Sequence, residues 1–319
     1  MIKYYKKEND QVFEIQGPAK DCWINIYPPF DQKKLKELSE ELEIPFDFLT
    51  DSIDINERSR FEKDDDVMLM VINTPIKNSG ELTVDLDSDY IVVPIGIILL
   101  SDMIVTISAS ENPVMDWFAE NTIVKLKPQD RGLFVLKIFE KNVNYYIRTL
   151  KNINNKRNLI EKELYDSSRN EELAKMLNLQ KSLVYFVTNL RANEQVMMKV
   201  QRTNQLNFDK EDELAHDYFQ DIIIDNSQAL EMANFYTNIL NGTMDAFASI
   251  ISNNLNNVMK RLTAVTIILM VPTLIASFYG MNVGTLPLAK IPQSFATIVI
   301  ISIIFAAIVY WFFRQKKFF

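Results

Sequence analysis

Small and polar side chains recur at helical spacing through the C-terminal third of the chain. They are separated by three or four residues, which places them on one face of a single helix. The stripe contains Ser277, Thr273, Met270, Thr266, Thr263, Met259, Asn256, Ser252, Ser249 and Asp245. The neutral hydroxyl and amide oxygens among these side chains can hydrogen-bond the water shell of a cation. Close helix packing uses the same residue types, but the stripe is longer than a packing patch needs. We interpret it as a pore lining.

The stripe ends in the turn Gly280-Met281-Asn282, within the sequence SFYGMNVGTLP at positions 277–287. A free backbone carbonyl and the Asn282 amide can contact an ion there. The upper half of the stripe lies in a run without charge, 262–279, and a second such run follows at 295–313. Each run is long enough to span a bilayer as a helix. We therefore expect two membrane helices, the first of which carries the stripe.

Basic residues flank the two apolar runs unevenly. Two precede the first run and three follow the second, whereas the linking segment carries one: Lys260 and Arg261, then Arg314, Lys316 and Lys317, with Lys290 in the link. Cytoplasmic flanks of membrane helices are enriched in Lys and Arg, so both chain ends are expected in the cytoplasm and the link outside. The predicted location is the plasma (inner) membrane of the cell, in a multi-pass protein.

Composition excludes several classes of function. The net charge of −8 over 319 residues argues against a nucleic-acid partner, because there is no basic excess to displace counterions from phosphate. The single Cys22 and single His216 exclude disulfide frameworks and His-pair zinc sites. Neither standard glycine-rich nucleotide loop occurs, so no nucleotide is expected. The polar N-terminus is not a secretory signal. We predict a protein that is not an enzyme and whose larger part is cytoplasmic.

The N-terminal part of the chain, 1–130, alternates between strand-like and helix-like segments. Strands are predicted at 11–16, 22–28, 67–74, 90–100 and 103–108, where β-branched and aromatic residues dominate. Helices are predicted at 31–45, which Asp31 can cap and Pro45 can stop, and at 112–121. The three aspartates 64–66 indicate a solvated turn rather than a metal cluster, because adjacent side chains seldom converge on one ion. This part of the chain is predicted to be an α/β domain.

Long helices are predicted for the rest of the chain. The segment 133–205 contains neither Gly nor Pro and is interrupted only at 165–170, which indicates a helical hairpin. From Glu213 to Tyr279 the only breakers are Gly242 and Pro272, so one helix of roughly 100 Å is expected, at 1.5 Å per residue. A rod of that length needs packing partners, which copies of the same chain can supply.

The expected organisation has seven segments. They are an α/β domain at 1–130, a hairpin at 131–206, a stalk at 207–261, a pore-lining membrane helix at 262–279, an external loop at 280–294, a second membrane helix at 295–313 and a basic tail at 314–319. The fold class is thus an α+β membrane protein with a cytoplasmic α/β domain, long helices and two C-terminal membrane helices.

The tripeptide Gly-Met-Asn, placed between two C-terminal apolar helices and followed by a basic RQKK tail, resembles the CorA family of magnesium and divalent-cation transporters. The resemblance extends over the whole chain. It implies a homopentameric funnel in a lipid bilayer, in which the first membrane helices surround one pore. It also implies that the protein mediates Mg²⁺ uptake.

The resemblance also assigns roles to residues. Gly280, Met281 and Asn282 match the outer ion-recognition ring, Thr273 and Met270 the pore lining, and Leu262, Met259, Asn256 and Asp245 the cytoplasmic narrowing. A regulatory Mg²⁺ site pairs Asp51, in LTDSIDINERSRFE, with Asp221, in YFQDII, of a neighbouring subunit. One feature departs from the family. Its outer loop usually continues to Met-Pro-Glu, whereas this chain has Leu286-Pro287-Leu288 and then Lys290.

The implied mechanism is electrostatic. Mg²⁺ holds its waters tightly, so a membrane pore without carboxylates would pass the hydrated ion. A divalent ion gains roughly 4.6 kcal/mol per 100 mV of inside-negative potential, which requires no ATP. Two alternatives stay open. The same fold can carry Zn²⁺, Co²⁺ or Ni²⁺, although the scarcity of His and Cys favours magnesium. A non-conducting oligomeric scaffold or sensor with two membrane helices would share the architecture.

Overall fold

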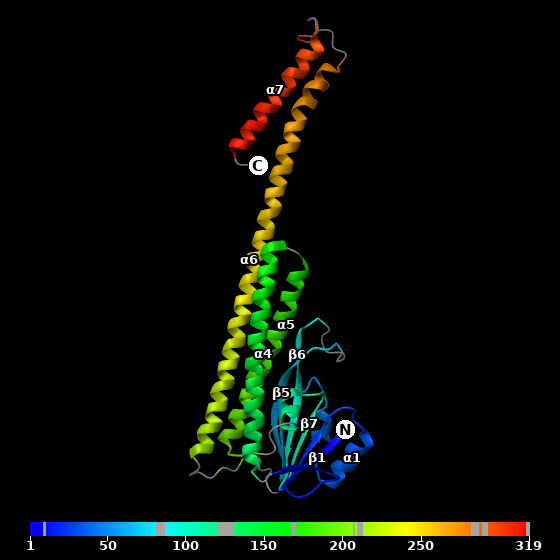
Figure 1. The fold of residues 1–319 in the computed structure, drawn as a ribbon, viewed down its shortest axis with the longest axis vertical. Coiled ribbons are helices and arrows are strands. Elements are labelled where there is room, and N and C mark those ends of the chain that lie inside the picture. Colours follow the sequence, from blue (N-terminus) through cyan, green and yellow to red (C-terminus); the bar gives the residue numbers. More distant parts are fainter. Residues whose placement is uncertain are drawn as a thin grey trace. The chain divides into compact units, whose positions relative to one another are not determined.

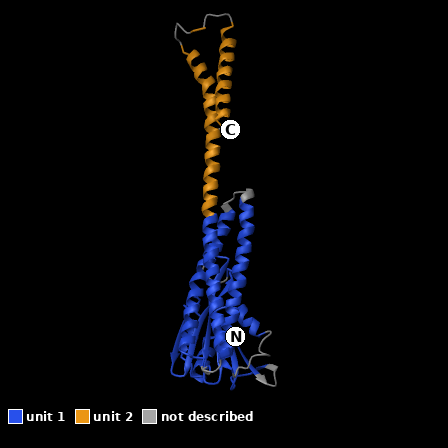
Figure 2. Ribbon diagram, turned by 90° about the vertical axis from the view of Figure 1, so that its left-hand side faces the viewer, with its two compact units in different colours: residues 1–243 blue, residues 244–319 orange. Residues whose placement is uncertain are grey.

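The computed structural model describes residues 1–319 except 9–10, 81–86, 120–129, 168–169, 207, 209–212, 282–286, 289–292 and 317–319. The described chain falls into two compact units, 1–243 and 244–319, which Figure 2 colours separately.

The first unit contains a seven-stranded sheet. Its strands are β1 (Ile2–Glu8), β2 (Gln11–Ile15), β3 (Cys22–Ile26), β4 (Arg60–Asp64), β5 (Val67–Lys77), β6 (Tyr90–Leu99) and β7 (Ile104–Ser108). They lie in the order β2-β1-β3-β7-β6-β5-β4, with β3 and β7 parallel and every other pair antiparallel. The central strands are apolar on both faces, because both faces of the sheet are covered.

Helices cover the two faces of this sheet. On one face lie α1 (Gln32–Glu41) and α2 (Phe46–Asp51), whose Leu35, Leu38 and Phe48 pack on Ile24 of β3. Asp31 caps α1 by accepting hydrogen bonds from the backbone N–H groups of Lys33 and Lys34, as the sequence predicts. On the other face lie α3 (Pro113–Trp117) and the start of α4 (Arg131–Ser167), whose Phe134 ring lies 5.6 Å from the ring of Trp23. Trp23 and Ile24 point to opposite faces, as successive strand residues must.

The long helices are α4 (Arg131–Ser167), α5 (Asn170–Arg202), α6 (Glu213–Tyr279) and α7 (Ser294–Gln315). α4 and α5 form the expected hairpin alongside the sheet, and the lower part of α6 lies beside them (Figure 1). Asn226 of α6 donates to the Leu190 carbonyl of α5 at 3.0 Å, and Gln180 of α5 donates to Asn241 of α6 at 2.7 Å. α6 is one helix of 67 residues over the predicted span.

Three short elements were not predicted from the sequence. β1 and β4 are rich in charged residues, and β4 is an edge strand with one exposed flank, so neither shows the apolar pattern of a central strand. α2 has six residues, too few for helical periodicity to be visible. The triple aspartate forms the tight turn between β4 and β5, where Asp64, Asp65 and Asp66 are exposed, in agreement with the predicted solvated turn.

Candidate ion pathway and cation sites

The residues of the predicted pore stripe lie exposed on one face of α6. The predicted pore positions are the ten residues of the stripe and Leu262, and the side chains of all eleven are exposed. Met259 is exposed by 52%, Leu262 by 58% and Met270 by 61%. The less exposed positions of the same span lie on another face: Ala264, Ile268, Val271, Pro272, Ile275 and Tyr279. At 100° per residue these two sets point in opposite directions. Figures 1 and 2 both draw α7 beside this part of α6.

It follows that α7 covers the back of α6 and leaves the polar stripe open. Ala264, on the less exposed face, is fully buried, and α7 is the other helix described in this unit. A stripe of hydroxyls, thioethers and amides that no described element of its own unit covers is available to the same face of other copies. Several such faces around an axis would enclose a path lined with neutral acceptors.

Threonines of the stripe present oxygen acceptors to that path. The Thr273 hydroxyl donates to the Leu269 carbonyl at 2.9 Å, and the Thr266 hydroxyl donates to the Leu262 carbonyl at 2.9 Å. A hydroxyl whose hydrogen is engaged with its own helix keeps acceptor lone pairs for a second partner. Both side chains are exposed, so these lone pairs are open to water or to the hydration shell of an ion. This arrangement suits a hydrated cation better than an anion.

The end of α6 is tied to the loop that follows it. The Gly280 N–H donates to the Ala276 carbonyl at 2.9 Å, which extends the helical pattern by one residue, and Met281 is 53% exposed. The Tyr279 hydroxyl donates to the Pro287 carbonyl at 2.9 Å, eight residues further on. Asn282, the predicted ligand of the hydration shell, lies outside the described residues.

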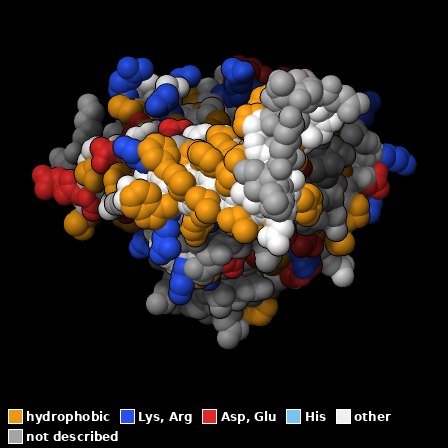
Figure 3. Space-filling view, turned by 90° about the horizontal axis from the view of Figure 1, so that it is seen from above, with side chains coloured by type: hydrophobic (Ala, Val, Ile, Leu, Met, Phe, Trp, Pro, Cys, Tyr) orange, Lys and Arg blue, Asp and Glu red, His pale blue; other side chains and the backbone are white. Residues whose placement is uncertain are grey.

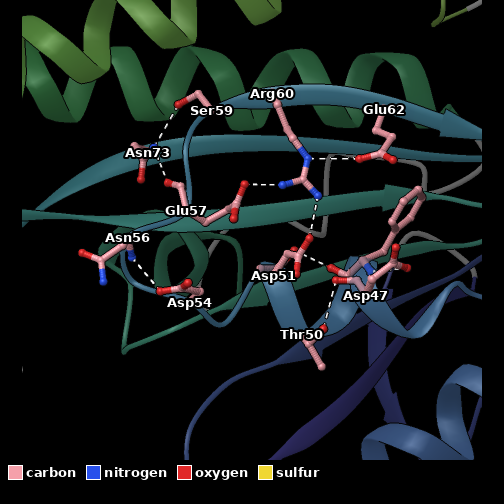
Figure 4. A network of polar contacts seen from close by, with 12 residues as sticks. Asp47, Thr50, Asp51, Asp54, Asn56, Glu57, Ser59, Arg60, Glu62 and Asn73 are labelled. Atoms are coloured by element: carbon pink, nitrogen blue, oxygen red, sulfur yellow. Dashed lines mark hydrogen bonds and ion pairs between the residues drawn. The ribbon is translucent and has the colours of Figure 1, made fainter.

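Asp51 is held by an arginine that sequence reasoning did not single out. Arg60 Nη2 lies 2.8 Å from the Asp51 carboxylate, Arg60 Nε lies 3.1 Å from Glu62, and Arg60 also pairs with Glu57 (Figure 4). Burial disfavours the charged guanidinium, but its hydrogen bond to Asp51 and the carboxylates of Glu57 and Glu62 outweigh that effect and raise the pKa of Arg60. One cation is therefore shared by three carboxylates.

α2 positions Asp51 through close contact with the sheet. Gly96 of β6 faces Ser52, and a Cβ added at Gly96 would lie 2.0 Å from Ser52 Oγ. Any larger residue at this position would push α2 away from the strand. Ser52 Oγ in turn donates to the Phe48 carbonyl at 2.7 Å. The last turn of α2, and with it Asp51, is thereby fixed on the sheet.

A buried amide links the neighbourhood of Arg60 to the helical hairpin. Asn193 of α5 is fully buried, and its Oδ1 accepts from the Asn73 N–H at 2.9 Å and from Ser59 Oγ at 2.7 Å. Its Nδ2 donates to the Asn73 carbonyl at 2.8 Å. The pairing of β4 with β5 ends where Arg60 lies opposite Val71, so β4 gives Asn73 no ladder partner. Asn193 supplies the partners that a neighbouring strand would otherwise give.

Asp221, the second predicted regulatory acid, lies exposed on α6. Its neighbours Phe219 and Ile222 pack in the core on the hairpin face of the sheet, whereas Phe48 and Leu49, close to Asp51, pack in the core on the opposite face. The fold of one chain therefore does not bring the two acids together. Among the described residues, no three metal-ligating His, Cys, Asp or Glu side chains converge. A cation shared by Asp51 and Asp221 would require two chains.

The last two helices define a class of protein. Part of α6 and the whole of α7 are long and apolar enough to cross a membrane. Only 6% of the apolar stretch of each helix is buried. Figure 3 shows hydrophobic side chains gathered in a continuous strip. The chain thus combines a sheet domain, a helical hairpin and the unusually long α6 with two apolar C-terminal helices. These are the parts of a two-span membrane transporter fold.

Comparison with known proteins identifies the family. Residues 19–315 match the model of the CorA-like Mg²⁺ transporter protein family, and the chain belongs to that family. It is 30% identical to the cobalt/magnesium transport protein CorA of Methanocaldococcus jannaschii, over 92% of this chain and 90% of that one. It is 23% identical to the protein of the same name from Thermotoga maritima, over 97% and 86% of the two chains.

Solved structures support the same assignment. The complete structure of the CorA magnesium transporter from Methanocaldococcus jannaschii aligns with a TM-score of 0.82 at 25% identity, over 100% of this chain and 99% of that chain. The cytoplasmic domain of ZntB from Vibrio parahaemolyticus aligns with a TM-score of 0.57 at 14% identity, over 80% of this chain and 97% of that one, which shows a shared fold only. The predicted fold class is confirmed.

Proposed function

We propose that this chain is a channel-like transporter that mediates Mg²⁺ uptake across the plasma membrane, driven by the membrane potential. The observation that carries the proposal is the open polar face of α6 opposite the α7-covered face, in a chain that belongs to the CorA-like family. Neutral oxygens along that face can hydrogen-bond the first hydration shell of a divalent ion. The ion would keep its waters, which avoids the high cost of dehydrating Mg²⁺.

The working unit of this proposal is a homopentamer in a lipid bilayer. A single stripe cannot enclose an ion path, whereas copies arranged about an axis can, and closed symmetric assemblies are the common solution. We expect both termini in the cytoplasm, because basic residues flank the first apolar helix at its start and the second at its end. The turn at Gly280, Met281 and Asn282 then forms the outer mouth.

Regulation is assigned to intracellular Mg²⁺ bound between subunits by Asp51 and Asp221. Carboxylate oxygens are the ligands that Mg²⁺ prefers. Because these acids lie on opposite faces of the sheet within one chain, a site built from both couples two neighbouring chains. Bound Mg²⁺ would stabilise one arrangement of the stalks over another, which a ligand-driven switch requires.

The experiment is ion flux into proteoliposomes containing the purified chain, with Mg²⁺, Co²⁺, Ni²⁺ and Zn²⁺ compared under an imposed inside-negative potential. Two of the relatives above are named cobalt/magnesium transport proteins, so cobalt is the competing ion with the most direct support. We expect potential-dependent Mg²⁺ entry. Faster Co²⁺ than Mg²⁺ entry at equal concentration would move the assignment to the softer metal, and no flux of any ion would favour the scaffold alternative.

A further inference from the structure

The C-terminal part of the chain, 246–319, carries cations without counter-ions. Its sequence contains six Lys and Arg residues and no Asp or Glu, although the chain as a whole has a net charge of −8. Four of the six are described: Lys260, Arg261, Arg314 and Lys316. All four are exposed, and within the described residues none of them forms an ion pair.

The two cations of α6 lie one helical turn before the buried residue Ala264. Lys260 and Arg261 precede Ala264 by four and three residues, and residues at these spacings share a helix face. Ala264 is fully buried on the covered face. The stripe, which includes Met259 and Thr263, lies on another side of the helix. Arg261 therefore lies on the less exposed side of the helix. Lys260 lies between that side and the stripe, because it lines one hollow together with Met259 and Thr263.

The cations of α7 reach the same depth in the membrane. α6 ends at Tyr279 and α7 begins at Ser294, so the spans 260–279 and 294–314 separate Lys260 and Arg314 from the linking loop. At 1.5 Å per residue each span measures about 30 Å, and antiparallel helices joined by one loop therefore place the two charged pairs at one level. Lys316 follows Phe313 and Val309 at helical spacing, on the less exposed side of α7.

Polar donors without charge lie just below this level. A hollow of about 570 Å³ runs along α6 and is lined by Asn253, Asn256, Asn257, Met259, Lys260 and Thr263. Asn257 precedes Arg261 by four residues and so adds an amide donor on its side of the helix. The level thus combines guanidinium, ammonium and carboxamide groups, the donors that bind phosphate oxygens.

We propose that Lys260, Arg261, Arg314 and Lys316 form a binding site for the phosphate headgroup of an anionic phospholipid of the cytoplasmic leaflet. The position of the site decides the source of the phosphate. The four cations lie at the ends of apolar spans whose exposed side chains would contact acyl chains in a bilayer, so a phosphodiester that carries acyl chains would gain contacts that free phosphate cannot make. The proposal rests on the membrane insertion that the proposed function requires, and not on the identity of the ion.

The test compares lipids on the full-length protein. Detergent-solubilised protein is titrated with phosphatidylglycerol, with phosphatidylcholine and with inorganic phosphate, and bound lipid is measured by native mass spectrometry and by thermal stabilisation. The variants are K260Q/R261Q and R314Q/K316Q. The control, K36Q/K151Q, removes two exposed cations of α1 and α4, which belong to the other unit.

We expect phosphatidylglycerol to bind and stabilise the wild type, with either test variant weakening it by about tenfold to thirtyfold at about 1 kcal/mol per cation. The control variant should bind as wild type does. Equal stabilisation by phosphatidylcholine, or by inorganic phosphate, would overturn the proposal. So would unchanged phosphatidylglycerol binding in both test variants.

The proposed lipid site and the proposed function can be disproved independently of each other. If the protein conducts no ion but binds phosphatidylglycerol through these cations, the proposed function falls and the lipid site stands. If ion flux is normal and both test variants bind phosphatidylglycerol as the wild type does, the proposed lipid site is wrong and the proposed function stands.

Discussion

The guanidinium of Arg60 lies 2.8 Å from the carboxylate of Asp51, the acid proposed to bind regulatory Mg²⁺ (Figure 4). Arg60 occupies the position beside Asp51 that a bound cation would take, and it also pairs with Glu57 and Glu62. A divalent ion arriving at Asp51 would have to displace or share this arginine. The ion pair would therefore raise the Mg²⁺ concentration at which the proposed sensor responds.

Replacing Arg60 with Gln removes the competing cation and leaves Asp51 free. We expect Mg²⁺ to protect the chain from proteolysis at about fivefold lower concentration, because a partly exposed ion pair contributes about 1 kcal/mol. The measurement is protease protection against Mg²⁺ concentration. Arg58→Gln is the matched control, since Arg58 is exposed and makes no described contact with Asp51. If Arg60→Gln is half-protected at the same Mg²⁺ concentration as the wild type, the arginine does not compete with Mg²⁺ for Asp51.

Replacing Asp51 and Asp221 together with Asn tests the sensor itself. Without Mg²⁺ the two acids would repel one another across a subunit boundary, and bound Mg²⁺ would cancel that repulsion. The double variant should lose most of the Mg²⁺-dependent protection and should close less completely at high internal Mg²⁺. Protection curves identical to wild type would remove these residues from the regulatory proposal without affecting the proposed pore.

Replacing Asn193 with Ala tests the link between the sheet and the hairpin. The change removes the acceptor of the buried Asn73 N–H and of the Ser59 O–H, although Ser59 Oγ still accepts from Asn73 Nδ2, and the cost is about 3 kcal/mol. We expect the melting temperature of the first unit to fall by about 6–12 °C. Trp23 and Trp117 report on this unit by fluorescence. Asn189→Ala is the control, because its side chain bonds within α5, to the Tyr185 carbonyl; a fall as large in that variant would argue against a special role for Asn193.

The sequence predicted the large elements and the polar face, for physical reasons. Long runs without Gly or Pro leave little alternative to helix, and a stripe with steps of three and four residues can lie on only one face. The same sequence did not predict the partners of Asp51, because Arg60 lies in a charged segment where several acids compete for it. It did not predict the role of Asn193 either, because an isolated Asn in a helix indicates a solvated position. Such contacts depend on which segments the tertiary fold brings together.

Replacing Tyr279 with Phe tests the contact that closes the mouth loop. The hydroxyl bond to the Pro287 carbonyl contributes about 1 kcal/mol, and its loss lets the start of the loop move away from its later part. We expect flux to fall about twofold to fivefold with the oligomeric state unchanged. Tyr236→Phe removes a hydroxyl from the other unit and should conduct normally. Full flux in Tyr279→Phe would mean that the loop holds its conformation without this bond.

Replacing Asn282 with Ala tests the proposed outer mouth. Asn282 directly follows Met281, so along the chain its side-chain amide comes just after the end of the polar stripe. The amide offers both an acceptor and donors to the hydration shell, and alanine offers neither. Flux should fall by about tenfold or more, because a mouth that no longer matches the hydrated ion loses its preferred contacts at the first step of entry.

The assembly should survive the Asn282→Ala change, since the helix face that would hold the copies together precedes the substitution in the chain. Native mass spectrometry and thermal melting would show that the assembly is intact. Isotope flux in proteoliposomes would show the loss of ion transport. Wild-type flux from an intact assembly would show that the ion is recognised elsewhere along α6. The Thr273 and Met270 positions would then be the next to replace, because both are exposed on the polar face.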